Sequence, residues 1–109
     1  MNYRLSDFAA EELRAATLYY ARQSRSLAVG FVEEAARSVT LLLVNPYLGE
    51  SVGKKYRRLL LRRFPYFLIY QVDAKSQLIS VISVAHHSRR PDYWRNRVRE
   101  GPALYALAA

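Results

Sequence analysis

The chain has 109 residues, of which 51% are hydrophobic, and carries a formal net charge of +8 at pH 7. This length provides one core and is too short for two ordinary domains, so we expect a single domain over residues 1–109. The absence of cysteine excludes a disulfide framework and a cysteine-ligated metal. The N-terminus lacks the apolar core of a signal peptide, and no apolar run in the helical part approaches the ~20 residues of a membrane span. We therefore expect a cytoplasmic protein that does not enter a membrane.

The charge is unevenly distributed along the chain. Residues 1–53 contain five Arg and six acidic residues, a net −1, whereas residues 54–109 contain twelve Lys and Arg and three acidic residues, a net +9. Such clustering of cations favours binding to a polyanion or to an acidic protein. A merely solvated, soluble surface is the alternative.

The first half of the chain predicts a short strand and two helices. Asn2–Leu5 is a candidate edge strand, and Ser6 or Asp7 can cap the helix that follows. Apolar residues recur on one face of that helix, with Glu12 lying off this stripe: Ala9, Leu13, Ala16 and Tyr20. After a break at residues 23–26, a second helical stripe follows: Ala28, Phe31, Ala35, Val39 and Leu42. Because the link is so short, the two helices should form an antiparallel hairpin.

The second half predicts a β-meander. Residues 45–53 contain one Pro and two Gly and are expected to form a loop. Three runs rich in β-branched and aromatic residues follow, at 57–63, 66–72 and 78–84. The core is predicted to contain the following side chains: Leu13, Phe31, Leu42, Tyr66, Ile69, Tyr70, Ile79 and Val81. The predicted fold class is α+β: an N-terminal strand, an antiparallel helix hairpin and a three-stranded antiparallel meander, with the helices packed on one sheet face.

The segment after the last strand, residues 85–99, is both basic and aromatic. Pro91 suits the first position of a short helix. Such a helix would place Tyr93, Trp94 and Arg97 close to the end of the last strand.

No pattern for metal binding or nucleophilic catalysis is present. The chain has no cysteine, no pair of histidines at helical spacing and no phosphate-binding glycine loop, so we expect no metal and no cofactor. His86 and His87 are adjacent at a strand end, which predicts side chains on opposite faces and only one of them in a cleft. A structural role and a catalytic role both stay open for that histidine.

Sheet topology should gather cations and aromatic rings at one end of the molecule. The expected cluster contains Arg58, Arg62, His87, Arg89, Arg90, Tyr93 and Trp94. Cations pair with phosphates and rings stack on unpaired bases, the combination that single-stranded RNA requires. Because Arg, Tyr and Trp also dominate protein-binding hot spots, the cluster fits a protein partner equally well.

The order of elements, together with the segments RRFPYFLIYQV and ISVAHHSRRPDYWRNR, resembles the RelE/ParE superfamily of bacterial toxins. The resemblance covers nearly the whole chain. Its most specific part is a His-x-x-Arg-x-Pro-x-Tyr-Trp segment, here His86, Arg89, Pro91, Tyr93 and Trp94. The resemblance implies the toxin of a type II toxin–antitoxin pair, bound in a hetero-oligomer by a cognate acidic antitoxin.

Two kinds of target are implied by this resemblance. RelE-like members cut messenger RNA on the ribosome by acid–base chemistry, and ParE-like members inhibit DNA gyrase. A nuclease would use Arg58, His87 and Tyr93 as its catalytic set, with the tyrosine losing its proton more easily beside cations. Leu60 and Phe67, however, stand where RelE-like nucleases carry cations. Because each missing charged contact costs on the order of 2 to 4 kcal/mol, the sequence favours a ParE-like toxin.

Partner and target binding is expected to use a set of cations and one aromatic residue. The set is Arg57, Arg62, Arg63, Arg89, Arg90, Trp94 and Arg97. The alternatives to a gyrase inhibitor are a ribosome-dependent endoribonuclease and a non-toxic basic module that binds protein or RNA.

Overall fold

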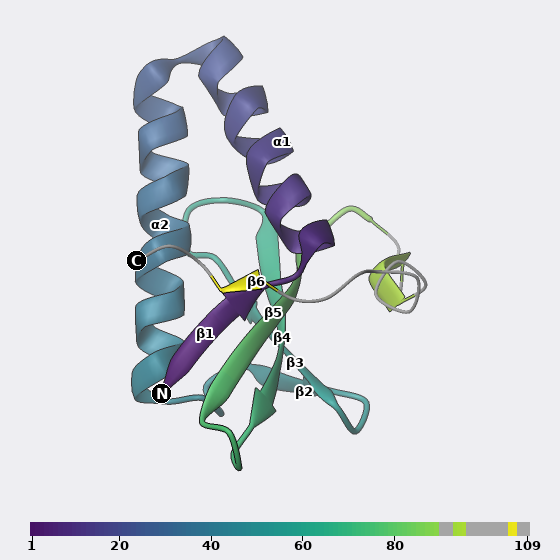
Figure 1. The fold of residues 1–109 in the computed structure, drawn as a ribbon. Helices are drawn as coiled ribbons and strands as arrows, with labels where there is room; N and C mark the ends of the chain where they lie inside the picture. The colour runs from purple at the N-terminus through teal and green to yellow at the C-terminus, as the bar shows by residue number, and fades with distance from the viewer. Residues whose placement is uncertain (90–92, 96–104, 107–109) are drawn as a thin grey trace.

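The structure is a computed structural model that describes residues 1–89, 93–95, 105 and 106. Its elements are β1 (Asn2–Leu5), α1 (Asp7–Gln23), α2 (Arg25–Val44), β2 (Glu50–Val52), β3 (Tyr56–Leu60), β4 (Tyr66–Asp73), β5 (Leu78–His86) and β6 (Tyr105–Ala106). Residues 93–95 add a helical turn. Figure 1 shows the hairpin of α1 and α2 on one side of the sheet and this turn on the other. The predicted α+β architecture, with both helices on one sheet face, is confirmed.

A serine caps the start of each helix, and of the two caps that the sequence offered for α1, Ser6 and Asp7, the structure has Ser6. Ser6 Oγ accepts a hydrogen bond from the Ala9 N–H at 3.0 Å, and Ser24 Oγ accepts one from the Leu27 N–H at 3.2 Å. Ser24 is the only residue between α1 and α2, so the chain reverses sharply and the helices pack side by side. Among the residues that the structure describes, no helix combines the length and apolarity of a membrane span.

The sheet has the strand order β2-β3-β4-β5-β1-β6. Strands β3, β4 and β5 form the predicted antiparallel meander, and β1 pairs with β5 in parallel. The prediction that β1 is an edge strand is wrong, because β6 pairs with its outer side. The sequence also missed β2 within the expected loop. This strand has only three residues, and Gly53, with φ at 65°, makes the turn that returns the chain to β3.

A bulge in β5 sets the direction of the side chains at its end. The register between β4 and β5 shifts at Ile69 and Tyr70, where β5 contributes Ile82 as an extra residue. Beyond it the alternation changes phase, so that Val84 faces the helices and Ala85 faces the opposite side. Bulges re-aim side chains in this way, and here the re-aimed residues reach the site described below.

The main core lies between the helices and the sheet. Five of the predicted core residues are fully buried there: Phe31, Leu42, Tyr70, Ile79 and Val81. Leu13 and Tyr66 are half-buried and pack against this core. Ile69 is buried too, but in a smaller cluster on the opposite face, with Ile82 and Trp94. The sheet is therefore covered on both faces by different parts of the chain.

Candidate binding site

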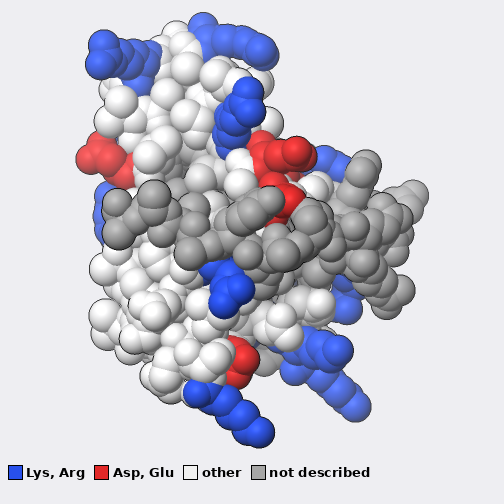
Figure 2. Space-filling model, viewed as in Figure 1, with Lys and Arg blue, Asp and Glu red and all other residues white. Residues whose placement is uncertain are grey.

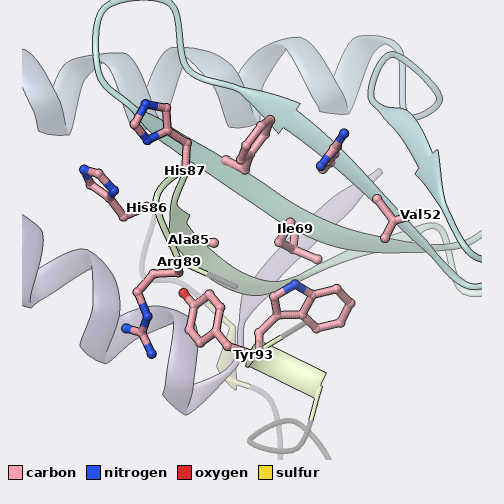
Figure 3. Close-up of a pocket in the computed structure, with 10 residues that line it drawn as sticks. Val52, Ile69, Ala85, His86, His87, Arg89 and Tyr93 are labelled. Carbon is pink, nitrogen blue, oxygen red and sulfur yellow. The ribbon is translucent and has the colours of Figure 1, made fainter. Parts of the chain in front are cut away.

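The face opposite the helices carries a small pocket of about 90 Å³ between the strands and the helical turn at residues 93–95. The residues that line it are Val52, Arg58, Phe67, Ile69, Ala85, His86, His87, Arg89, Tyr93 and Trp94. Figure 3 shows Arg89 beside Tyr93, with both histidines near one end of the pocket and Val52 at the other. Cationic groups and aromatic rings thus surround an apolar floor.

Arg58 enters the pocket from β3. Its guanidinium carbon lies 4.8 Å from the centre of the Phe67 ring, and its Nε donates to the Glu50 carboxylate on β2. Leu60, two residues further along β3, is 52% exposed. The one cation that β3 places in this pocket is therefore already paired with a carboxylate.

The two histidines both line the pocket, at its rim. Their ring centres are 4.9 Å apart, so the prediction that they lie on opposite faces is wrong. The alternation holds only within a strand, and His87 lies beyond the end of β5, where its N–H donates to the Pro65 carbonyl at 2.8 Å. The His86 ring packs 5.0 Å from the Tyr66 ring, and its Nδ1 accepts from the Ser88 N–H at 3.0 Å. In the described part of the chain, no three metal-ligating side chains are grouped together.

Tyr93 is held by hydrogen bonds and by a cation. Its hydroxyl donates to the Glu12 carboxylate and lies 3.4 Å from Ser83 Oγ, while the Arg89 guanidinium lies 4.0 Å from the centre of its ring. Burial, together with the hydrogen bond to Glu12, raises the pKa of Tyr93. This corrects the expectation that nearby cations would make Tyr93 lose its proton more easily. A phenol with a raised pKa stays protonated at neutral pH and is a poor general base.

Glu12 is the residue of this site that the sequence did not reveal. It lies off the apolar stripe of α1, yet its carboxylate accepts hydrogen bonds from Ser83 Oγ, from the Val84 N–H at 2.8 Å and from the Tyr93 hydroxyl. Burial raises the pKa of Glu12, and the three donors together with Arg89 act in the opposite direction. A single carboxylate on the polar side of a helix carries no signal of such a role.

The structure divides the predicted cluster into two groups. Five of its members meet at the pocket: Arg58, His87, Arg89, Tyr93 and Trp94. Arg62 lies elsewhere, in a second hollow beside α2 that it shares with Arg63. Arg90 and Arg97 fall outside the described residues, and their predicted roles stay predictions.

The second hollow combines exposed cations with a buried acid. Glu34 is 1% exposed, pairs with Arg37 at 2.9 Å and accepts from the Arg62 backbone N–H at 2.9 Å. The side chains of Arg62 and Arg63 are exposed, and Glu33 completes the lining. This hollow therefore presents positive charge next to the helix hairpin.

Two other predicted binding residues make contacts within the chain. Arg57 donates to the Gly49 carbonyl at 2.7 Å and lies over the Tyr47 ring at 5.0 Å. Trp94 is 1% exposed, and its ring packs 4.8 Å from that of Tyr56. Both residues shape the site from within, and their part in partner binding stays a prediction.

The chain is a small basic α+β protein with a helix hairpin on one sheet face, and solved structures share this fold. The chromosomal ParDE TA system from P. aeruginosa is 22% identical, with a TM-score of 0.66, over 79% of this chain and 95% of that chain. The isolated RelE toxin of E. coli is 20% identical, with a TM-score of 0.59, over 91% of this chain and 97% of that chain.

Residues 3–91 match the family described as ParE toxin of type II toxin-antitoxin system, parDE. The chain belongs to this family and is a ParE-like member of the RelE/ParE superfamily. Among curated proteins, no sequence matches it. The family match ends before Tyr93 and Trp94, so this part of the pocket is described by the structure alone.

Proposed function

We propose that this chain is a toxin that arrests bacterial growth by inhibiting DNA gyrase in the cytoplasm, and that a cognate acidic antitoxin neutralises it. Membership of the ParE toxin family is the observation that carries this proposal. The positive charge of the second half of the chain suits both the encounter with a DNA-bound enzyme and capture by an acidic protein.

The features of the pocket favour recognition of a target over catalysis of RNA cleavage. The Tyr93 proton is held by burial and by Glu12, and the Arg58 cation is already paired with Glu50. Phe67 and the exposed Leu60 supply no charge where a nuclease would need cations for the phosphorane-like transition state. The pocket therefore has the features of a recognition surface.

The hairpin side supports an antitoxin partner. Exposed apolar side chains lie on and just after the C-terminal half of α2, among them Leu41, Val44 and Leu48. Figure 2 shows an uncharged area over this half of the helix. Arg62 and Arg63 stand exposed in the hollow beside the same helix. An acidic segment that folds into an amphipathic helix would match both features.

Growth and supercoiling assays test this proposal directly. Induced expression of the chain alone should arrest growth, and co-expression of an acidic protein from the neighbouring reading frame should relieve the arrest. Purified chain should inhibit supercoiling by gyrase. The paired charge reversal Arg62→Glu with Arg63→Glu should weaken antitoxin binding, whereas Lys75→Glu, in the β4–β5 turn, should not. Folded protein that accumulates without slowing growth and leaves supercoiling intact would favour the non-toxic binding module.

A ribosome-dependent endoribonuclease is the second candidate function. The observation in its favour is that Arg58, His87, Arg89 and Tyr93 share one pocket, with two imidazoles available for proton transfer. This second function predicts cleavage of messenger RNA on ribosomes, which a gyrase inhibitor does not cause.

A further inference from the structure

Beyond the end of β1, the edge of β5 is hydrogen-bonded by two side chains, one from the N-cap residue of α1 and one from α1 itself. β1 pairs with β5 only as far as Leu5. Past this point Ser6 Oγ donates to the Ile82 carbonyl at 2.8 Å, and the Glu12 carboxylate accepts from the Val84 N–H at 2.8 Å. Backbone groups at a sheet edge otherwise need water or another strand. Two side chains of the helical segment therefore continue the hydrogen bonding of a strand.

The same carboxylate also joins this edge to the pocket. Oε1 of Glu12 accepts hydrogen bonds from the Val84 N–H and the Ser83 hydroxyl, and Oε2 accepts one from the Tyr93 hydroxyl. The Arg89 guanidinium stacks on the Tyr93 ring, 4.0 Å from its centre. One carboxylate thus links α1, β5 and the helical turn that lines the pocket.

These contacts add to the aromatic and apolar packing of the same helical turn. Besides Glu12, Tyr93 meets the Phe8 ring from the start of α1 at 6.0 Å, edge to face. Trp94 packs into the small cluster on the same face with Ile82 and Ala85. Hydrogen bonds to a charged acceptor are stronger and more directional than neutral ones. Glu12 therefore adds directional hydrogen bonds to the apolar packing that holds the turn.

We propose that Glu12 is a positioning residue for the surface with which this toxin meets its target. Its carboxylate fixes Tyr93, and through Tyr93 it holds Arg89 and the turn containing Trp94 against the sheet. That this surface meets the target rests on the proposed function, whereas the positioning of Tyr93 by Glu12 does not.

Amide hydrogen exchange in Glu12→Gln tests the positioning. Glutamine keeps the size of glutamate but removes its charge and turns one acceptor into a donor that faces other donors. Glu11→Gln is the matched control, because Glu11 is the adjacent residue of α1 and is exposed. Losing a hydrogen bond to a charged group shifts a docking equilibrium by about tenfold or more. The amides of Tyr93, Trp94 and Arg95 should therefore exchange about tenfold faster in Glu12→Gln and at the wild-type rate in Glu11→Gln.

The central strand separates local release from general destabilisation. If Glu12 acts on the turn, the Tyr70 amide in β4 should exchange at nearly the wild-type rate. The double variant Glu12→Gln with Tyr93→Phe should exchange no faster at Trp94 than Glu12→Gln alone. The reason is that both substitutions break the same hydrogen bond, between Tyr93 and Glu12. Exchange at residues 93–95 that is unchanged, or that rises only as much as at Tyr70, overturns the proposal.

Two further readouts complete the test. If Glu12→Gln does not fold, Tyr93→Phe must by itself speed exchange at Trp94 and Arg95, and unchanged exchange there overturns the proposal. In the supercoiling assay, about tenfold more Glu12→Gln than wild type should be needed for equal inhibition, with Glu11→Gln at the wild-type level. A wild-type chain that leaves gyrase unaffected contradicts the proposed function, while the exchange data still decide the role of Glu12.

Discussion

The two faces of the sheet are covered in different ways. On one face, α1 and α2 bury a continuous apolar core in which Phe31, Leu42 and Tyr70 are fully buried. On the other, a single helical turn covers a smaller cluster around Trp94, fixed at its side by the Glu12 carboxylate. The first face is held by one large apolar core, and the second by a smaller apolar cluster with hydrogen bonds to Glu12 at its side.

Because of this difference, we expect one face to determine mainly stability and the other mainly recognition. A core closed by two long helices tolerates little change, because the removal of buried atoms leaves cavities that the packed structure cannot fill. A short helical turn over a small cluster can shift or open without unfolding the rest. We therefore expect substitutions on the helix side to act on the free energy of unfolding and those on the pocket side to act on binding.

Replacing Phe31 tests the helix side and should have the largest effect. Phe31→Ala removes a fully buried ring and should lower the free energy of unfolding by about 3 to 5 kcal/mol. Val29, two residues earlier on α2, is 49% exposed, so Val29→Ala should change the free energy of unfolding by less than about 0.5 kcal/mol. Urea denaturation of both variants measures the contrast. Equal, small losses would mean that the helices do not close the core.

Replacing Trp94 tests the pocket side. Trp94→Ala removes a side chain as well buried as Phe31, yet it should destabilise the protein less, because a turn that opens locally limits the loss to its own docking free energy. Inhibition of gyrase should fall at the same time. If urea denaturation shows a loss as large as that of Phe31→Ala, the two faces form one cooperative core.

Arg89 offers a test of recognition without a change in stability. Its side chain is exposed and stacks on Tyr93, so Arg89→Ala should alter the free energy of unfolding by less than about 0.5 kcal/mol. Because Arg89 is a central cation of the pocket, its removal should weaken target binding by more than about 1 kcal/mol, or roughly fivefold in affinity. Lys75→Ala serves as the control distant from the pocket. Binding that is unchanged in Arg89→Ala would place recognition elsewhere.

The smallest expected effect concerns alkaline pH. Because the pKa of Tyr93 is raised, the folded chain binds this proton more tightly than the unfolded chain does. The stability that results is complete below the unfolded pKa of about 10 and is lost as the pH rises above it. In thermal denaturation from pH 8 to 11, Tyr93→Phe should lose less stability than wild type. The control is Tyr47→Phe, which should follow the wild type because Tyr47 is 56% exposed.

Periodicity and capping predicted much of the helix side. The apolar stripes placed Phe31 and Leu42 in the core, and Ser6 was one of the two caps expected for the first helix. The meander followed from its three β-rich runs. Strands β2 and β6 were missed because two or three residues form no recognisable pattern, and the place of β1 depends on a strand more than seventy positions away.

The pocket side could be predicted only in part. Arg58, Arg89 and Tyr93 were expected together and do meet, because only β4 separates β3, which carries Arg58, from β5, which leads to the other two residues. Arg62 was assigned to the same group, but β3 ends at Leu60 and the chain then turns toward α2. The role of Glu12 appears only once the end of β1 and the path of β5 are known. Such contacts depend on tertiary geometry that no local pattern records.

The claim that the pocket recognises its target rather than cuts RNA is tested most directly on translating ribosomes. Purified chain should be added to a translation reaction, and the messenger RNA mapped by primer extension. The protonated, Glu12-bound Tyr93 and the missing cations predict intact messenger RNA at concentrations that inhibit gyrase. Cleavage at defined codon positions that disappears in Tyr93→Phe would contradict the account and make Arg58, His87 and Tyr93 a catalytic set.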